Sequence, residues 1–187
     1  MTKTLIIGLG NPILGDDGVG WVVAQEVEKI LTAPPSSPPN FADLRETGGM
    51  KGGREEKVGD IKVECLALAG IALMEQMVGY ERVVLVDSLN TGQHAQGEVV
   101  SFSLDSLEDL LHGHSASAHD LSLKAALKLG RSMGADLPRD EDIQIVAIEA
   151  AHIYDFTEEL TPAIAAAVPI AVEKVFTLLK SQEGVQP

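Results

Sequence analysis

A strand-to-helix turn near the N-terminus is the feature that most constrains how this chain folds. The apolar residues 5–10 predict a buried strand that ends in a glycine turn. A helical pattern follows over residues 16–31, with apolar residues at spacings of three and four: Val19, Val22, Val23, Val27 and Ile30. Asp16 is a candidate N-cap of this helix. A strand that leads directly into a helix is the repeating unit of α/β proteins.

The rest of the chain continues this alternation. Further strands are expected at residues 61–68, 82–87, 97–104 and 143–148, and helices at 71–78, 105–111, 119–129 and from 162 onward. We expect Gly130 to end the 119–129 helix, Thr161 to cap the last helix, and Pro169 to kink or restart it. The pattern predicts a largely parallel sheet covered on both faces, with ligands bound beyond the carboxyl ends of its strands.

The length of 187 residues suits a single domain over residues 1–187. One segment, residues 33–60, departs from the pattern. It contains a proline-rich stretch at 34–39 and a glycine-rich stretch at 48–57, with a possible short strand at 41–47. We expect this segment to be a mobile insertion.

The formal net charge of −14 limits the kinds of partner. Nucleic acids and anionic lipids bind basic surfaces, so neither is expected as a partner. A metal ion or a basic protein segment remains compatible with this charge. The longest apolar stretch, residues 163–179, is broken by Pro169, Glu173 and Lys174, so no membrane span is expected. The start of the sequence shows no secretory signal, and the single cysteine, Cys65, fits a cytoplasmic location.

The glycine-rich turn invites comparison with dinucleotide-binding loops. Gly8 and Gly10 fit the pattern G-x-G-x-x-G, but Ile13 occupies the third glycine position. Asp16 and Asp17 would lie where a phosphate binds, and their charges would repel it. Two acids at the end of a strand favour a cation instead, although both could simply complement the helix dipole.

Three residues are candidates for a shared site: Asp17, Asp87 at the end of the 82–87 strand, and His119 at the start of a helix. Two carboxylates and one imidazole could bind a divalent transition-metal ion and leave coordination positions open. Each residue also has a simpler interpretation. Asp17 could only complement the helix dipole, Asp87 could be a turn residue, and His119 could be a solvated or packed histidine. Cys65 carries no signature of a nucleophile and is expected to pack as a small apolar residue. The histidines at 112 and 114 match no closed zinc pattern.

The residues Gly8-x-Gly10-Asn11 followed by Asp16-Asp17-Gly18-x-Gly20 resemble those of the nickel-iron hydrogenase maturation proteases. The resemblance extends to the strand 83–87, to the segment Ser117-Ala118-His119, and to Leu160-Thr161-Pro162 before the last helix. It implies a three-layer α/β/α sandwich around a mostly parallel twisted sheet of about five strands.

The resemblance also implies a function. The chain would be an endopeptidase that removes the C-terminal tail from the large-subunit precursor of the hydrogenase after nickel insertion. Asp17, Asp87 and His119 would bind the nickel carried by the substrate, and the same residues are candidates for catalysis. No organic cofactor is implied. Many family members have an Asp-Gly-Gly-Thr-like segment after the second strand, whereas residues 64–70 here read Glu-Cys-Leu-Ala-Leu-Ala-Gly, which leaves the hydrogenase partner open.

Two other functions match parts of the sequence. Peptidyl-tRNA hydrolases also begin with Gly-Leu-Gly-Asn-Pro, but the Tyr and the Thr-Arg-His-Asn segment expected next are missing from residues 13–21, and the acidic charge opposes tRNA binding. The second is a non-catalytic nickel-dependent assembly chaperone for a hydrogenase on the same scaffold. Transfer of nickel without removal of the tail would distinguish a chaperone from a protease.

Overall fold

The computed structural model describes residues 2–33, 60–106 and 118–181, without the side chains of residues 118–122. The expected mobile insertion at 33–60 lies almost wholly outside the described residues, as do the expected short strand at 41–47 and the histidines at 112 and 114. The predictions for these segments therefore stay predictions.

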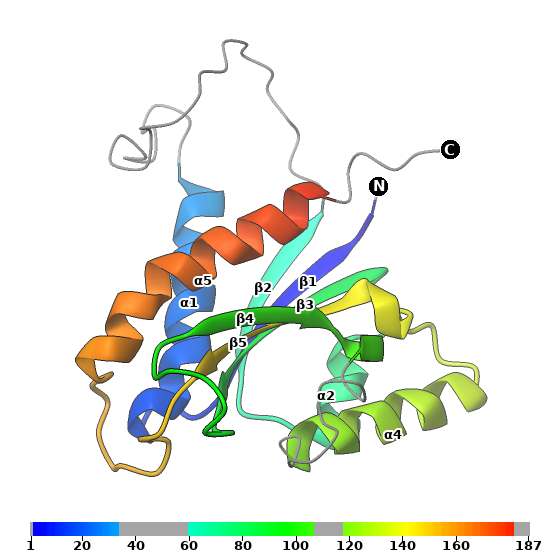
Figure 1. Ribbon diagram of the computed structural model, residues 1–187. Coiled ribbons are helices and arrows are strands. Elements are labelled where there is room, and N and C mark those ends of the chain that lie inside the picture. The colour runs from blue at the N-terminus through cyan, green and yellow to red at the C-terminus, as the bar shows by residue number, and fades with distance from the viewer. Residues whose placement is uncertain (1, 34–59, 107–117, 182–187) are drawn as a thin grey trace.

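A twisted five-stranded sheet forms the centre of the molecule (Figure 1). Its strands, in chain order, are β1 (Thr4–Leu9), β2 (Ile61–Leu66), β3 (Arg82–Leu89), β4 (Val99–Ser103) and β5 (Ile143–Glu149). They lie side by side in the order β2-β1-β3-β5-β4. All neighbouring pairs are parallel except the edge pair of β4 and β5, which is antiparallel. The expected α/β fold with a mostly parallel sheet is confirmed.

Helices cover both faces of the sheet, giving three layers (Figure 1). One face carries α1 (Val19–Thr32) and α5 (Pro162–Ser181), and the other carries α2 (Gly70–Gln76) and α4 (Ala118–Ser132). Short 3₁₀ turns η1 (Gly15–Gly18), η3 (Leu104–Ser106) and η4 (Asp140–Asp142) precede α1, follow β4 and precede β5, respectively. The beginnings of α1 and α4 and the loop between β5 and α5 all lie at the end of the sheet where the parallel strands finish.

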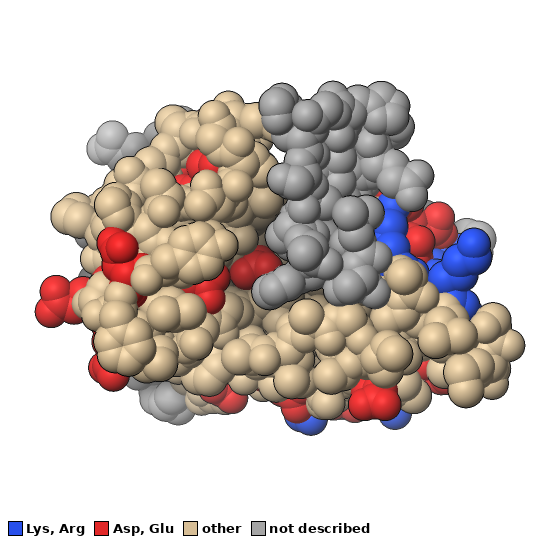
Figure 2. Space-filling model, turned by 90° about the horizontal axis from the view of Figure 1, so that it is seen from below, with Lys and Arg blue, Asp and Glu red and all other residues tan. Residues whose placement is uncertain are grey.

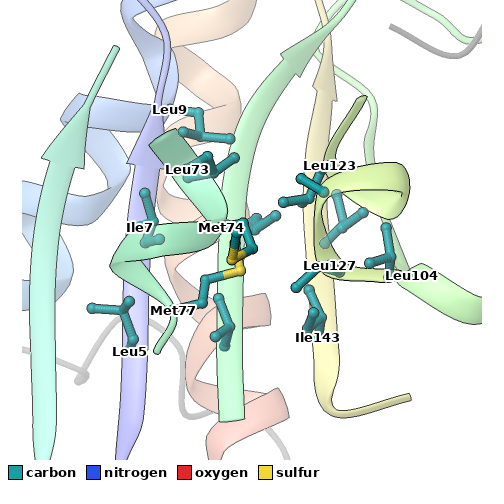
Figure 3. Close-up of a cluster of buried hydrophobic side chains, with 14 of the residues drawn as sticks. Leu5, Ile7, Leu9, Leu73, Met74, Met77, Leu104, Leu123, Leu127 and Ile143 are labelled. Carbon is teal, nitrogen blue, oxygen red and sulfur yellow. The ribbon is translucent and has the colours of Figure 1, made fainter. Parts of the chain in front are cut away.

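Two apolar cores follow from the alternation of side chains along the strands. Leu5, Ile7 and Leu9 of β1 pack against α2 and α4, a cluster shown in Figure 3. Ile6 points to the opposite face and joins the cluster beneath α1 and α5. Because both faces are covered, the inner strands are apolar over most of their length, and each fully buried Leu or Ile contributes about 1.5–3 kcal/mol.

The structure corrects two local expectations. Asp16 does not cap the first helix: η1 precedes α1, and Gly18 is the N-cap without a side-chain hydrogen bond. Gly130 does not end α4, which continues to Ser132. The absence of a side chain at Gly130 instead leaves room for the side chains of Leu137 and Met74. The turn instead closes at Gly134, where φ is +86°. There, the Gly134 amide bonds to the Arg131 carbonyl and the Ala135 amide to the Gly130 carbonyl.

Helix α5 begins at Pro162, as expected, and runs through Pro169 to Ser181 without restarting. By length and composition alone it could cross a membrane, and it is the one such helix in the described part of the chain. One helix of this kind is weak evidence for a membrane span, because core helices of soluble proteins can have the same length and composition. Here its buried residues contact the sheet and α1: Ile164, Ala167, Val168, Ala171, Val172 and Val175.

Candidate functional site

The glycine motif brings the start of α1 into direct contact with the sheet. A Cβ atom on Gly20 would lie 2.2 Å from the carbonyl oxygen of Leu9 and 2.4 Å from that of Val86. A Cβ on Gly8 would lie 2.2 Å from the carbonyl oxygen of Gly20. The motif therefore serves close packing of helix and strand, and this packing places the acids of η1 beside the carboxyl ends of β1 and β3.

Asp17 lies in η1 at this edge and is half-buried. Its Oδ2 accepts a 2.7 Å hydrogen bond from the backbone amide of Asn11, and its Oδ1 accepts a 3.1 Å bond from the Ser88 hydroxyl. Both donors are uncharged. Since each carboxylate oxygen can accept more than one bond, Asp17 keeps capacity for a further ligand.

Asp87 lies within β3, not at its end as the sequence suggested, because the strand continues to Leu89. It pairs in register with Ala147 of β5 and is half-buried. Its Oδ1 accepts a 2.8 Å hydrogen bond from the Ser88 amide. Ser88 thus contacts both acids, one through its backbone and one through its hydroxyl. The structure brings Asp17 and Asp87 to one place, although they are 70 residues apart in the sequence.

His119 lies in the first turn of α4, at the same end of the sheet (Figure 1). Its side chain is outside the described set, so its proximity to the two carboxylates stays a prediction. Among the side chains that are described, no group of three or more His, Cys, Asp and Glu could hold a metal ion. The described part of the site is therefore a carboxylate pair, which suits a divalent cation but supplies only part of a ligand set.

The sequence of this chain matches a known protein family. The sequence model of the HycI family, described as hydrogenase maturation protease, matches residues 67–178, more than half of the chain. The chain belongs to the hydrogenase maturation protease family. The match includes Asp87 and His119, and the motif containing Asp17 precedes it. A search of curated protein sequences found no match.

Solved structures of maturation proteases have the same fold. HybD from Thermococcus kodakarensis is 24% identical with a TM-score of 0.66, and the match covers 96% of this chain and 100% of that one. HybD from E. coli is 20% identical with a TM-score of 0.65, covering 99% and 96%. HycI from Thermococcus kodakarensis KOD1 is 18% identical with a TM-score of 0.58, covering 96% and 93%. At these identities the likeness shows the fold alone.

Membership of this family makes the chain an endopeptidase of hydrogenase maturation. The assembly-chaperone interpretation receives no support from the comparisons, and neither does peptidyl-tRNA hydrolase.

The other acid of the motif, Asp16, has a different role in this maturation protease. Asp16 is fully buried, and its two oxygens accept bonds from the Thr161 amide at 2.7 Å and the Thr161 hydroxyl at 2.9 Å. It therefore joins η1 to the start of α5, across 145 residues of sequence. The sequence predicted that each residue caps its own helix, which is wrong for Asp16, and it could not show that the two pair with each other.

We expect Asp16→Ala to lower the free energy of unfolding by about 2–4 kcal/mol, because two partly buried donors of Thr161 lose a buried charged acceptor. Thr161→Val, which removes only the hydroxyl, should cost about 1 kcal/mol. Urea unfolding followed by circular dichroism measures both. A cost for Asp16→Ala no larger than that of Thr161→Val would show that the carboxylate adds nothing beyond the hydroxyl bond.

Glu149 is a buried acid that the sequence did not single out. It ends β5 and is 4% exposed. Its carboxylate accepts bonds from the amides of Thr91 and Gly92, at 2.8 and 2.7 Å, and from the Thr91 hydroxyl at 2.8 Å. Glu149 thereby fixes the loop that follows β3, at positions three and four residues beyond Ser88. An acid directly after an apolar strand was the available signal, the same one that identified Asp87.

Cys65 lies half-buried near the end of β2, with its Sγ 3.8 Å from the carbonyl oxygen of Trp21. Burial, together with the negative charge of Glu28, raises the pKa of its thiol. A raised pKa leaves less thiolate at neutral pH, which opposes a nucleophilic role.

We expect iodoacetamide at pH 7.5 to alkylate Cys65 at least ~10-fold more slowly in the native protein than in urea, because the thiolate is the reactive form. Cys65→Ala should leave processing of the substrate unchanged. Mass spectrometry of timed samples measures the labelling. Equal rates in the native and unfolded states would contradict the effect of burial.

Proposed function

We propose that this chain removes the C-terminal tail from a hydrogenase large-subunit precursor that already carries nickel, with Asp17, Asp87 and His119 contacting that nickel. The observation that carries the proposal is the carboxylate pair joined through Ser88 at the carboxyl edge of the sheet, in a chain of the maturation protease family. Nickel here is part of the substrate.

The chemistry of the pair supports recognition of a cation. Two carboxylates held close together repel each other unless a positive charge lies between them. The hydrogen-bond donors to Asp17 are neutral, so they orient the carboxylate without neutralising it. A nickel ion in the precursor would be attracted to both carboxylates, and an imidazole from His119 would be a suitable additional ligand. An apo precursor would lack this attraction, which explains why cleavage would follow metal insertion.

The same carboxylates are candidates for the hydrolytic step. Once the precursor is bound, Asp17 or Asp87 could take a proton from the water that attacks the scissile carbonyl. Alternatively, the pair only positions the peptide. Separate measurements of docking and of cleavage distinguish the two roles: a variant that docks normally but does not cleave has lost the hydrolytic group.

The choice of hydrogenase is expected to involve the segment after β2, where this chain departs from the Asp-Gly-Gly-Thr pattern. In the structure, Leu66 at the end of β2 accepts a 3.2 Å hydrogen bond from the indole of Trp21, which fixes the end of this strand against α1. The following residues lead into α2 near the same edge of the sheet as the carboxylates.

The test is mass spectrometry of a nickel-loaded large-subunit precursor before and after incubation with the protein, with the apo precursor as control. Loss of a C-terminal peptide from the nickel-loaded form alone is the expected result. Cleavage of both forms would refute nickel recognition, and cleavage of neither, with a precursor from the same organism, would refute removal of the tail.

A further inference from the structure

Two aromatic side chains project into solvent from the loop between β5 and α5. Tyr154 is 80% exposed and Phe156 is 84% exposed. The chain has only four Phe, two Tyr and one Trp, and its cores are built from aliphatic residues. Exposing two of so few aromatics on one short loop is costly unless a partner covers them.

This loop is joined to the segment that carries Asp17. The Gly15 amide donates to the Thr157 carbonyl at 2.7 Å, and the Asp16 amide donates to the His152 carbonyl at 3.1 Å. Leu14 and Thr157 form a parallel bridge. Backbone bonds on both sides of the aromatic pair thus hold the loop against the acidic turn, which is η1 with Asp16 and Asp17. The aromatic pair therefore lies on a loop whose backbone is bonded to the turn that carries Asp17.

The surroundings of the pair are acidic. Asp155, Glu158 and Glu159 lie on the same loop and are exposed. The sequence has no Lys or Arg between Arg139 and Lys174. Figure 2 views this end of the molecule: acidic groups lie among uncharged atoms on the half that holds the loop, and the blue of Lys and Arg lies toward the opposite end and along one edge. The surface therefore combines apolar rings with negative charge.

We propose that Tyr154 and Phe156, with the flanking acids, form a docking surface for a segment of the hydrogenase precursor in which apolar side chains stand beside Lys or Arg. This inference rests on the proposed function and adds to it where the substrate is held. Charge complementarity selects the basic apolar partner, and the backbone bonds to the acidic turn place the docked segment next to the carboxylate pair. Aromatic residues are the side chains most often found to dominate binding at protein interfaces.

The first experiment measures the Kd between the full-length protein and the nickel-loaded precursor by biolayer interferometry, and the cleavage of the same precursor by mass spectrometry. The Tyr154→Ala/Phe156→Ala variant should weaken binding by at least ~30-fold. Met133→Ala is the matched control, because Met133 is 79% exposed at the end of α4, outside this surface, and its loss should leave the Kd unchanged.

The second experiment tests the charge. Glu158→Lys/Glu159→Lys should weaken binding by ~10-fold or more and reduce its dependence on salt. Glu81→Lys/Asp105→Lys reverses two exposed acids at the opposite, amino edge of the sheet and should change the Kd far less.

The outcomes separate this inference from the proposed function. Cleavage by the wild type with an unchanged Kd in the aromatic variant overturns the docking surface and leaves the protease function standing. Binding that depends on the aromatic pair, without cleavage by the wild type, supports the docking surface and overturns the protease function. If sedimentation shows that the aromatic pair instead mediates self-association and does not affect precursor binding, the occupant is a second copy and the docking proposal is wrong.

Discussion

Replacing Asp17 with Asn should reduce nickel-dependent processing of the precursor by at least about 10²-fold while leaving the fold intact. Asparagine keeps the shape of the side chain, and its carbonyl oxygen can still accept a hydrogen bond. It loses the negative charge that would attract the nickel and the basicity needed to activate water. Asp87→Asn should have an effect of the same order. Single-turnover cleavage of the nickel-loaded precursor, followed by mass spectrometry, measures both.

Ser88 provides a graded test of the same site. Its hydroxyl donates to Asp17 while its amide donates to Asp87, so Ser88→Ala removes the orientation of Asp17 alone. We expect a loss of about 10-fold for this change, because a hydrogen bond to a charged group contributes about 1.5 kcal/mol or more. Ser88→Thr, which restores a hydroxyl, should recover part of the activity. Asp105→Asn is the control, because Asp105 is an exposed acid at the amino edge of the sheet.

Full activity in both the Asp17→Asn and Asp87→Asn variants would remove the carboxylate pair from the mechanism.

Replacing Gly20 with Ala should lower the free energy of unfolding by about 3 kcal/mol or more, since overpacking of this kind forces the backbone to move. The new Cβ would lie 2.2 and 2.4 Å from two carbonyl oxygens that belong to β1 and β3. Both oxygens belong to the sheet, so neither can move aside as a flexible side chain would. The usual effect has the opposite sign, because Ala in a helix interior is about 1 kcal/mol more favourable than Gly. Thermal and urea unfolding of the purified variant measure the change.

Gly134→Ala is the control for this substitution. Gly134 has a φ of +86°, and no atom outside its own turn lies within 4 Å of a Cβ placed there. Its replacement should cost about 1–2 kcal/mol from backbone strain alone. Equal costs at the two positions would show that α1 can move away from the sheet, and the close approach would then not be a requirement of the fold. Processing activity should fall further in Gly20→Ala than stability alone explains, because the same movement displaces Asp17.

Much of the fold is written in local patterns. The apolar run of β1, the three-and-four spacing in α1 and the Thr161-Pro162 start of α5 depend on residues near one another, so they can be recognised without knowledge of the rest of the chain. Errors arose where a distant residue decided the outcome. Gly130 resembles a helix terminator, yet the side chains of Met74 and Leu137 pack where its Cβ would be. A local pattern contains no information about either neighbour.

The site divides in the same way. The sequence by itself predicted that Asp17 and Asp87 lie at one edge of the sheet, because acids that follow apolar runs are expected near the carboxyl ends of parallel strands, and their role in a site stays a prediction. Tertiary structure alone decided that Ser88 joins them and that Asp16 pairs with Thr161. It also decided that Glu149 secures the loop after β3 and that the Tyr154–Phe156 loop lies against the acidic turn. The physical reason is that strand and helix periodicity depend on neighbours along the chain, whereas hydrogen bonds between loops depend on the order and register in which the strands assemble.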